Sequence, residues 1–211
     1  MKVTVFGATG MIGRSVVVEL IRAGHHVTVF VRDPARLPPE AAGMVTSVRG
    51  ELLDGAALDS ALAGADAVIW AVGPVSNSPD QPGFFEAAAR ALVEAMSRHG
   101  VRRLVALSGA AVAMPGDRAT LPQRLFSRAL RLALRNVVGS KERERDVFSA
   151  SGLDWTLVRP GRVVAGTRDR PAELGPALRS NQVGSSELAA SMVGLLEADG
   201  LRYVGEAPFV S

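Results

Sequence analysis

Residues 3–13 read Val-Thr-Val-Phe-Gly-Ala-Thr-Gly-Met-Ile-Gly, and this stretch decides the fold. Its first four residues are β-branched or aromatic and favour a strand. Apolar residues then recur at every fourth position from Ile12 to Leu20, which puts them on one face of a helix. Gly24 stands where a helix commonly ends, and the apolar run at 26–31 predicts a second strand after a short connection. The stretch therefore predicts a strand–helix–strand unit.

The rest of the chain repeats this alternation of strand-like and helix-like segments. Further strands are expected at 45–48, 66–71, 103–107, 155–158 and 202–204. Helices are expected from Phe85 to Met96, closed by Gly100, and from Ser185 to Leu196, with Ser185 as the N-cap. The alternation predicts an α/β fold, a doubly wound parallel sheet with helices on both faces. We expect residues 1–211 to form one such domain.

Composition excludes several classes of protein. The 211 residues are 47% apolar and 21% charged, which is typical of a globular chain. The absence of cysteine excludes disulfides, thiolate catalysis and cysteine-based metal sites, and the placement of the three histidines predicts no other metal site. The longest apolar run, around Ala67 to Val75, contains Gly73 and Pro74 and is too short to span a bilayer. Strand-like sequence begins at Lys2, which leaves no room for a signal peptide, so we expect a cytoplasmic protein without membrane association.

The three glycines of the opening stretch lie between a strand and a helix, the context that makes such a pattern specific. Gly7 would permit a tight turn, Gly10 would let the backbone approach a pyrophosphate, and Gly13 would let the helix pack closely on the sheet. The N–H groups at the start of the helix would then bind the phosphates of a dinucleotide. The alternative is a glycine-rich turn that binds nothing. The loop residues expected to bind the cofactor are Gly7, Thr9, Gly10, Met11, Ile12 and Gly13.

The Gly-Ala-Thr-Gly motif and the spacing of its glycines resemble the short-chain dehydrogenase/reductase superfamily, in its atypical, NmrA-like branch. Residues 27–38, 151–161 and 186–189 look like the flavin reductase and biliverdin reductase type B group of that branch. The resemblance covers nearly the whole chain except a segment near 118–138, which looks like a helical insertion. It implies a Rossmann fold that binds NAD(P)H.

The end of the second strand should decide which dinucleotide binds. Arg32 stands there and Arg14 follows the third glycine, and two guanidinium groups suit the 2′-phosphate of NADP(H). Asp33 leaves NAD open, because a small rotation of the turn would offer a carboxylate to the ribose, and Arg32 could instead be a solvated turn residue paired with Asp33. The resemblance also assigns positions along the cofactor: Glu51 and Leu52 near the adenine, Ala71 and Gly73 along it, and Pro160 and Gly161 at the carboxamide.

The usual Tyr-x-x-x-Lys pair of short-chain dehydrogenases is incomplete in this chain. Lys141 fits the lysine, but Val137 stands four residues before it, and the one tyrosine, Tyr203, is expected in the last strand. Interconversion of carbinols and ketones is therefore disfavoured, because it needs a proton relay. Acceptors that delocalise the incoming charge remain, such as flavins, quinones and linear tetrapyrroles.

Three residues are candidates for the reaction itself. Ser108, or Gly109 if the register differs by one, would contact the nicotinamide or acceptor, although a serine at a strand end can instead cap backbone groups. The resemblance puts Lys141 on the nicotinamide ribose; otherwise it belongs to the charged, solvated run 141–145. Arg162 could attract carboxylates or a phosphate of the acceptor.

The net charge of +3 is concentrated in residues 118–145, where eight residues are basic and two are acidic. One face of a helix over 121–138 would be basic and the adjoining stripe apolar. We favour a helix that packs its apolar stripe on the domain with its arginines in water, over a lid or a partner surface. Nucleic acid is the least favoured partner, since no aromatic residues interleave with the arginines. The basic face comprises Arg124, Arg128, Arg131 and Arg135, and the apolar stripe comprises Leu125, Ala129 and Leu132.

Two functions fit these features. The first is an NADPH-dependent reductase of a small planar acceptor. The second is an NmrA-like redox sensor that binds NADP(H) without turnover and reports to a regulatory protein partner. A homodimer is compatible with both, and a nucleotide-sugar epimerase is disfavoured by the missing tyrosine and by the length of the chain.

Overall fold

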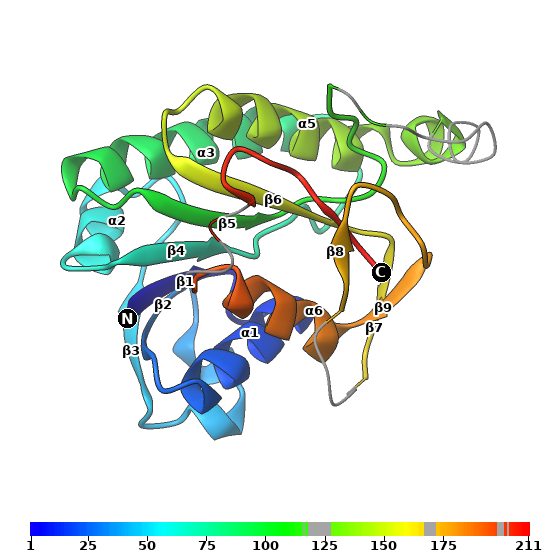
Figure 1. Ribbon diagram of the computed structural model, residues 1–211. Helices are drawn as coiled ribbons and strands as arrows, with labels where there is room; N and C mark the ends of the chain where they lie inside the picture. The colour runs from blue at the N-terminus through cyan, green and yellow to red at the C-terminus, as the bar shows by residue number, and fades with distance from the viewer. Residues whose placement is uncertain (116, 118–127, 167–171, 198–200, 202) are drawn as a thin grey trace.

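The structure is a computed structural model that describes residues 1–115, 117, 128–166, 172–197, 201 and 203–211. Figure 1 shows a twisted central sheet with helices on both sides. The strand order is β3-β2-β1-β4-β5-β6-β10-β8, and every neighbouring pair is parallel except β10 with β8. The order of the first six strands is that of a dinucleotide-binding doubly wound sheet, as expected. The strands are β1 Lys2–Phe6, β2 His26–Val31, β3 Val45–Arg49, β4 Ala67–Trp70, β5 Arg103–Leu107, β6 Asp154–Pro160, β8 Leu174–Gly175 and β10 Phe209–Val210, with β7 Arg162–Val164 and β9 Gln182–Gly184 forming a separate parallel pair.

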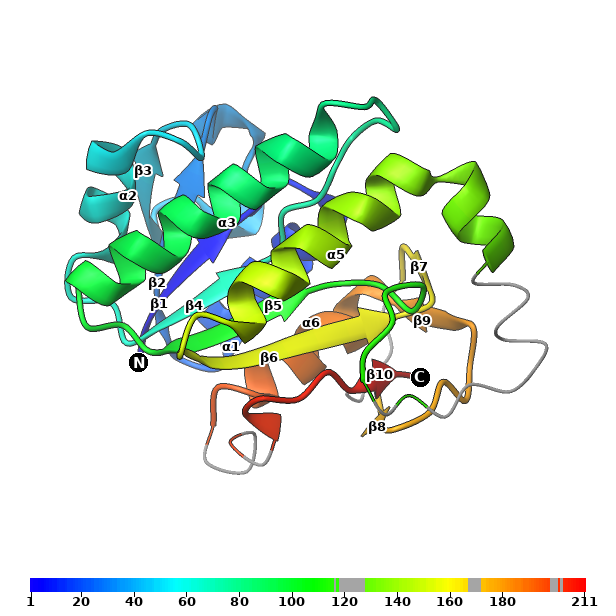
Figure 2. The ribbon, with the colours of Figure 1, turned by 90° about the horizontal axis from the view of Figure 1, so that it is seen from above.

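Helices form a layer on each face of the sheet. Figure 2 shows α3 and α5 side by side above the strands, and Figure 1 shows α1 and α6 together below them. The short α2 joins α3 on the upper face. The helices are α1 Met11–Arg22, α2 Gly55–Leu62, α3 Gln81–Arg98, α5 Arg135–Ser149 and α6 Ser185–Gly194, with short 3₁₀ turns at η1 Pro34–Arg36 and η2 Pro39–Ala41.

Each strand supplies side chains to both layers because successive residues point to opposite faces. Val3 and Val5 of β1 are buried with α1 and α6, whereas Phe6 is buried on the opposite face beneath α3 and α5. The Phe6 ring lies 5.4 Å from that of Trp70 on β4, and Trp70 lies edge-on to Phe148 of α5 at 6.2 Å. These aromatic contacts pack β1, β4 and α5 against one another, the three elements that carry much of the candidate site.

Several boundaries differ from the sequence-based expectations. The last strand is Phe209–Val210, and the expected strand at 202–204 is wrong: residues 203 and 204 lie in a turn, and residue 202 lies outside the described residues. Ser185 is the first residue of α6 rather than its N-cap, because the N–H of Gly184 donates to Glu187 Oε2 at 2.8 Å and Gly184 occupies the cap.

The basic segment is not one continuous helix. Residues 128–133 are helical, but the backbone turns at Leu134 and α5 begins at Arg135, so Arg131 and Arg135 do not share a helix face. The expected apolar stripe is also wrong, since Ala129 is exposed and Leu132 is 77% exposed. Arg124 and Leu125, which the same expectation included, lie outside the described residues.

None of the helices in the described ranges combines the length and hydropathy that crossing a bilayer requires.

Gly13 leaves less room for a Cβ than the other described glycines, so its replacement is a direct test of the packing. A Cβ at Gly13 would lie 2.0 Å from the carbonyl oxygen of Gly7. We expect Gly13→Ala to lower the free energy of unfolding by about 3 kcal/mol, the upper end of overpacking costs, because the obstacle is backbone. Gly194→Ala is the matched control, since a Cβ there meets nothing within 4 Å. Equal urea midpoints for the two variants would contradict this account of α1 packing.

Candidate functional site

The site lies where the carboxyl ends of β1, β4, β5 and β6 meet at one edge of the sheet. In open parallel sheets, ligands bind outside these ends, where the strand order reverses. The reversal here falls between β1 and β4. The segments at these strand ends, residues 7–10, 71–73, 108–110 and 160–161, include about half of the predicted site residues.

The glycine loop forms a tight turn that opens α1. Gly7 has a φ of +84°, and a Cβ on it would lie 2.6 Å from the carbonyl oxygen of Ala71. The N–H of Gly10 donates to Gly7 O at 3.0 Å, and Gly10 is the N-cap of α1. Gly10 and Met11 are exposed, whereas Ile12 packs against the core. The first N–H groups of α1 therefore stand at an open surface, the arrangement that binds phosphates.

Arginines surround the turn after β2. Arg14 donates from Nε to Thr9 O at 3.1 Å and from Nη2 to Arg36 O at 2.7 Å, so it joins the glycine loop to this turn. Arg32 is exposed. Asp33 does not pair with it in the structure; its Oδ1 accepts from the N–H of Ala35 at 3.1 Å and caps η1. The turn thus engages the carboxylate locally and leaves guanidinium groups at the surface.

The predicted adenine residues follow β3. Glu51 is exposed, and Leu52 is half-buried against the cluster under α3. Gly50 before them is required by packing, since a Cβ there would lie 2.5 Å from Ala57 Cβ and 2.7 Å from Phe30 Cζ. The carboxylate of Asp54 caps α2 by accepting from Ala57 N–H at 3.1 Å. Both acidic side chains of this loop are exposed, and Glu51 is the one that does not cap α2.

Lys141 is buried, which overturns its alternative assignment as part of a solvated charged run. Its side chain is 10% exposed, and Nζ donates to the carbonyl oxygen of Val72 at 2.5 Å and to Glu144 Oε2 at 2.7 Å. A Cβ on Gly73 would lie 3.7 Å from Lys141 Cε, so the lysine reaches the loop after β4. The ammonium group thus stands beside the strand ends that the glycine loop also contacts.

Glu144 is the residue that sequence reasoning missed. It is fully buried, and Trp70 Nε1 donates to its Oε1 at 2.9 Å while Lys141 donates to Oε2. Burial raises the pKa of Glu144, although the Lys141 charge and the hydrogen bonds from Lys141 and Trp70 oppose this effect. The available signal was the i, i+3 spacing from Lys141, which puts both side chains on one helix face.

Ser108 directly follows β5, and its backbone N–H donates to Val158 O at 2.8 Å. Its Oγ is buried and has no hydrogen-bond partner among the described residues, so it does not cap a backbone group as the alternative interpretation required. Buried hydroxyls are normally bonded. The orphaned Oγ is consistent with a hydroxyl that a ligand would complete.

The residues expected at the carboxamide lie at the end of β6 and directly after it, and part of their backbone is already bonded within the protein. The carbonyl oxygen of Pro160 accepts from Ala110 N–H at 2.9 Å, and proline has no N–H to offer. A Cβ on Gly161 would lie 2.6 Å from Asn181 O, so glycine is needed where the chain passes this loop. Arg162 begins β7 with an exposed side chain, and its N–H donates to Asn181 O at 2.7 Å.

No tyrosine accompanies Lys141 on α5, where Val137 is half-buried one turn earlier. Tyr203 is not in the last strand as expected. It lies in the preceding turn, and its hydroxyl donates to Leu174 O of β8 at 3.1 Å.

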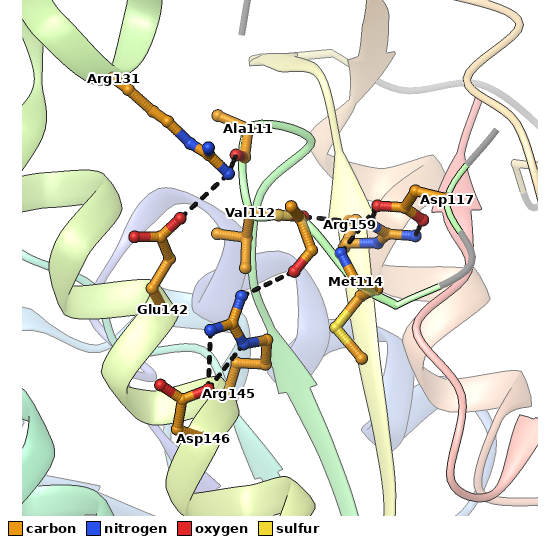
Figure 3. Close-up of polar contacts among 10 residues, drawn as sticks. Ala111, Val112, Met114, Asp117, Arg131, Glu142, Arg145, Asp146 and Arg159 are labelled. Atoms are coloured by element: carbon orange, nitrogen blue, oxygen red, sulfur yellow. Dashed lines mark hydrogen bonds and ion pairs between the residues drawn. The ribbon is translucent and has the colours of Figure 1, made fainter. Parts of the chain in front are cut away.

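Three arginines hold the loop after Ser108, as Figure 3 shows. The carbonyl oxygens of three consecutive residues, 111–113, accept from Arg131 at 3.1 Å, from Arg159 at 3.0 Å and from Arg145 at 2.6 Å. Arg131 also pairs with Glu142 of α5 at 3.0 Å, and is partly buried rather than solvated as expected. The loop that borders the site is thus tied to β6, to α5 and to residues 128–133.

These features fit a dinucleotide cofactor: an open helix N-terminus beyond a glycine turn, surface guanidinium groups, a buried ammonium and an orphaned hydroxyl lie along one sheet edge. A family model described as NAD(P)H-binding matches residues 7–199. The chain belongs to this NAD(P)H-binding family, among the atypical short-chain dehydrogenase/reductases. NAD(P)H is therefore the cofactor class of the site.

One relative in sequence is (4-alkanoyl-5-oxo-2,5-dihydrofuran-3-yl)methyl phosphate reductase of Streptomyces griseus. It is 36% identical over 165 residues, which are 78% of this chain and 49% of the relative. Cinnamoyl-CoA reductase 1 of Oryza sativa is 39% identical over 110 residues, 49% of this chain and 32% of the relative. The chain spans at most about half the length of these curated relatives.

Solved structures match over the whole chain. A short-chain dehydrogenase/reductase from Veillonella parvula in complex with NADP has a TM-score of 0.82 at 21% identity, covering 100% of this chain and 94% of that chain. ChuY, an anaerobillin reductase from Escherichia coli, has a TM-score of 0.79 at 17% identity, covering 100% and 96%. At these identities the likeness establishes the fold.

The bond between Arg159 and Asp117 predicts how the arginine-held loop responds to acid. Arg159 donates to both carboxylate oxygens of Asp117, at 2.6 and 2.7 Å. Burial raises the pKa of Asp117, but the bonds from Arg159 and from Met114 N–H outweigh it and hold the pKa below its usual value. A carboxylate of this kind adds stability above its unfolded pKa, and the contribution is lost as pH falls.

We therefore expect Asp117→Asn to lower the free energy of unfolding by about 2 kcal/mol at neutral pH. The difference from the original chain should shrink as pH falls below about 4, the unfolded pKa of an aspartate. Urea titrations at several pH values measure it, and Asp146→Asn, which alters an exposed pair with Arg145, should have a much smaller effect. A difference that does not change with pH would show that the charge of Asp117 is not responsible.

Proposed function

We propose that the chain is an NADPH-dependent reductase that delivers hydride to a planar acceptor such as a flavin, a quinone or a linear tetrapyrrole. One observation carries the proposal. A buried ammonium and an orphaned hydroxyl border the strand-end site, and Val137 stands where a phenol would be needed for carbonyl chemistry. The site can therefore orient a cofactor and an acceptor, but it lacks a tyrosine relay.

The chemistry of the acceptor follows from this absence. Reduction of a ketone leaves an alkoxide, which needs a proton from a positioned acid. A flavin, quinone or tetrapyrrole spreads the incoming charge over a conjugated system and can take its proton from water. The chain then acts chiefly by holding the two partners in reactive geometry.

Each part of the cofactor has residues suited to it. The start of α1 would bind the diphosphate, Arg14 and Arg32 the 2′-phosphate, and Lys141 the ribose hydroxyls next to the nicotinamide. When bound, the reduced nicotinamide supplies the hydride. Ser108 would hydrogen-bond the nicotinamide or the acceptor, and exposed Arg162 would attract an acidic acceptor. Glu51 and Leu52 would lie by the adenine, and Ala71, Gly73 and Gly161 along the rest of the cofactor.

The similarities support this class of reaction. The Streptomyces griseus relative is named as a reductase, and the Escherichia coli neighbour is named as a reductase of anaerobillin. The Veillonella parvula neighbour is described in complex with NADP.

Oxidation of NADPH should depend on the acceptor supplied. We expect absorbance of the reduced nicotinamide to fall when the protein is mixed with NADPH and riboflavin, FMN, a simple quinone or biliverdin. Simple ketones should give no oxidation, because Val137 stands where a tyrosine would be needed to protonate an alkoxide. Tight NADPH binding with no oxidation by any planar acceptor would refute the reductase and favour a redox sensor.

Arg32 should set the preference for the phosphorylated cofactor. We expect Arg32→Ala to raise the KM for NADPH about tenfold or more and to change the KM for NADH little, because only NADPH carries the 2′-phosphate. Arg22→Ala is the matched control, since Arg22 is exposed in the last turn of α1, at the opposite end from the glycine loop. Parallel loss of affinity for both cofactors would contradict this role of Arg32.

A further inference from the structure

A buried chain of polar contacts links the core to the candidate site. Trp70 of β4 is fully buried and its indole N–H donates to Glu144 Oε1 at 2.9 Å. The other carboxylate oxygen accepts from Lys141 Nζ at 2.7 Å. Both oxygens of Glu144 are therefore engaged, one by the sheet and one by the lysine, and the carboxylate has little freedom to turn.

The base of this contact chain is rigid. Trp70 packs against the rings of Phe6 and Phe148, with centroids at 5.4 and 6.2 Å. These rings belong to β1 and α5, the elements on either side. A side chain held by Trp70 is consequently held relative to the whole sheet.

Glu144 differs from the other charged residues of its helix. Glu142 pairs with Arg131, Arg143 pairs with Glu86, and Arg145 pairs with Asp146, and all of these contacts are at least partly exposed. Glu144 and Lys141 point inward, with side chains 3% and 10% exposed. The helix thus buries one ion pair next to the strand ends.

Stability alone does not explain such a pair. Taking two charges from water costs several kcal/mol per ion, and apolar residues of similar volume often stabilise a core equally well or better. A buried pair does give a defined geometry, because each charge has few other partners. The position of the Lys141 ammonium is the feature that the pair determines.

The donor count of Lys141 shows what that position offers. An ammonium has three N–H donors. One donates to Val72 O at 2.5 Å and one to Glu144, and the described residues provide no acceptor for the third. Nζ otherwise lies 6.0 Å from the centroid of the Phe85 ring and next to Gly73, in the loop after β4, so we take the third donor as the one that a ligand beside Gly73 would accept from.

We propose that Glu144 is the positioning residue of this site: anchored by Trp70, it holds the Lys141 ammonium at the carbonyl oxygen of Val72 so that one N–H remains for the bound dinucleotide. The inference rests on the proposed binding of NADPH at the strand ends and deepens it. Glu144 would not touch the cofactor or the acceptor; it would act through Lys141.

A double-mutant cycle in NADPH affinity tests this role, because it separates action through Lys141 from a general structural effect. The proteins compared are the original chain, Glu144→Gln, Lys141→Met and the double variant. We expect Lys141→Met to weaken NADPH binding about tenfold or more, as loss of a charged hydrogen bond should. Glu144→Gln should weaken it similarly alone, but should add nothing in the Lys141→Met background. Factors that multiply in the double variant would overturn the proposal.

Glu144→Gln leaves a buried ammonium without its counter-charge and could prevent folding. Trp70→Phe provides a second route, because it removes the indole donor and leaves the ion pair in place. We expect it to weaken NADPH binding severalfold with Lys141 present and not with Met at that position. Trp155→Phe is the matched control, because Trp155 of β6 is buried in the same core cluster as Trp70 but makes no hydrogen bond to Glu144 or Lys141 among the described residues. Equal effects of the two tryptophan variants, or an effect of Trp70→Phe in both backgrounds, would overturn the proposal.

Failure of the proposed function would look different. Binding of NADPH without oxidation by any acceptor would refute the reductase, whereas the affinity cycle would still report on Glu144. Non-additive affinities together with turnover would support both. Additive affinities with turnover would refute only the positioning role.

Discussion

The close approach of backbone to backbone at the glycine loop is the constraint on which this structure depends. There is no room for a Cβ at Gly7 beside Ala71, or at Gly13 beside Gly7 itself. Only glycine allows β1 to turn directly into α1 while β4 lies alongside. The result brings the amino end of a helix, with its unsatisfied N–H groups, to the carboxyl edge of the sheet where the strand order reverses. The remaining site residues are placed by the loops that leave the same edge.

Local patterns predicted the elements that contain this constraint and failed where tertiary contacts decide. The alternation around residues 3–31 predicted β1, α1 and β2 because short-range periodicity and turn glycines determine them. The strand expected at 202–204 instead forms a turn, and two residues, Phe209 and Val210, pair with β6. A strand of two residues shows no periodicity in the sequence, and only its pairing with β6 and β8 defines it. The break at Leu134 likewise leaves no mark in the spacing of the arginines.

The candidate site shows the same division. The glycine loop, Ser108 and Lys141 could be named from their place after strands or from resemblance, and the structure brings them to one edge of the sheet. What the sequence could not show was which members of the run 141–145 turn inward. Burial of Lys141 and Glu144 depends on Trp70, which is 74 residues from Glu144 along the chain. A charged run is usually solvated, and only the partner in the sheet identifies the exception.

The buried pair holds the loop after β4, and the three arginines hold the loop after β5. In both, charged side chains hold the loop through hydrogen bonds to its backbone carbonyls. A loop that is already held loses less conformational entropy when a ligand binds. A site that acts by orienting its cofactor and acceptor, without a tyrosine relay, depends on this rigidity. A crystal structure with NADPH tests the account most directly. It should show the diphosphate at the start of α1 and Lys141 Nζ on the ribose beside the nicotinamide, still bonded to Glu144. A nucleotide bound elsewhere, or a Lys141 that contacts no part of it, would contradict the account.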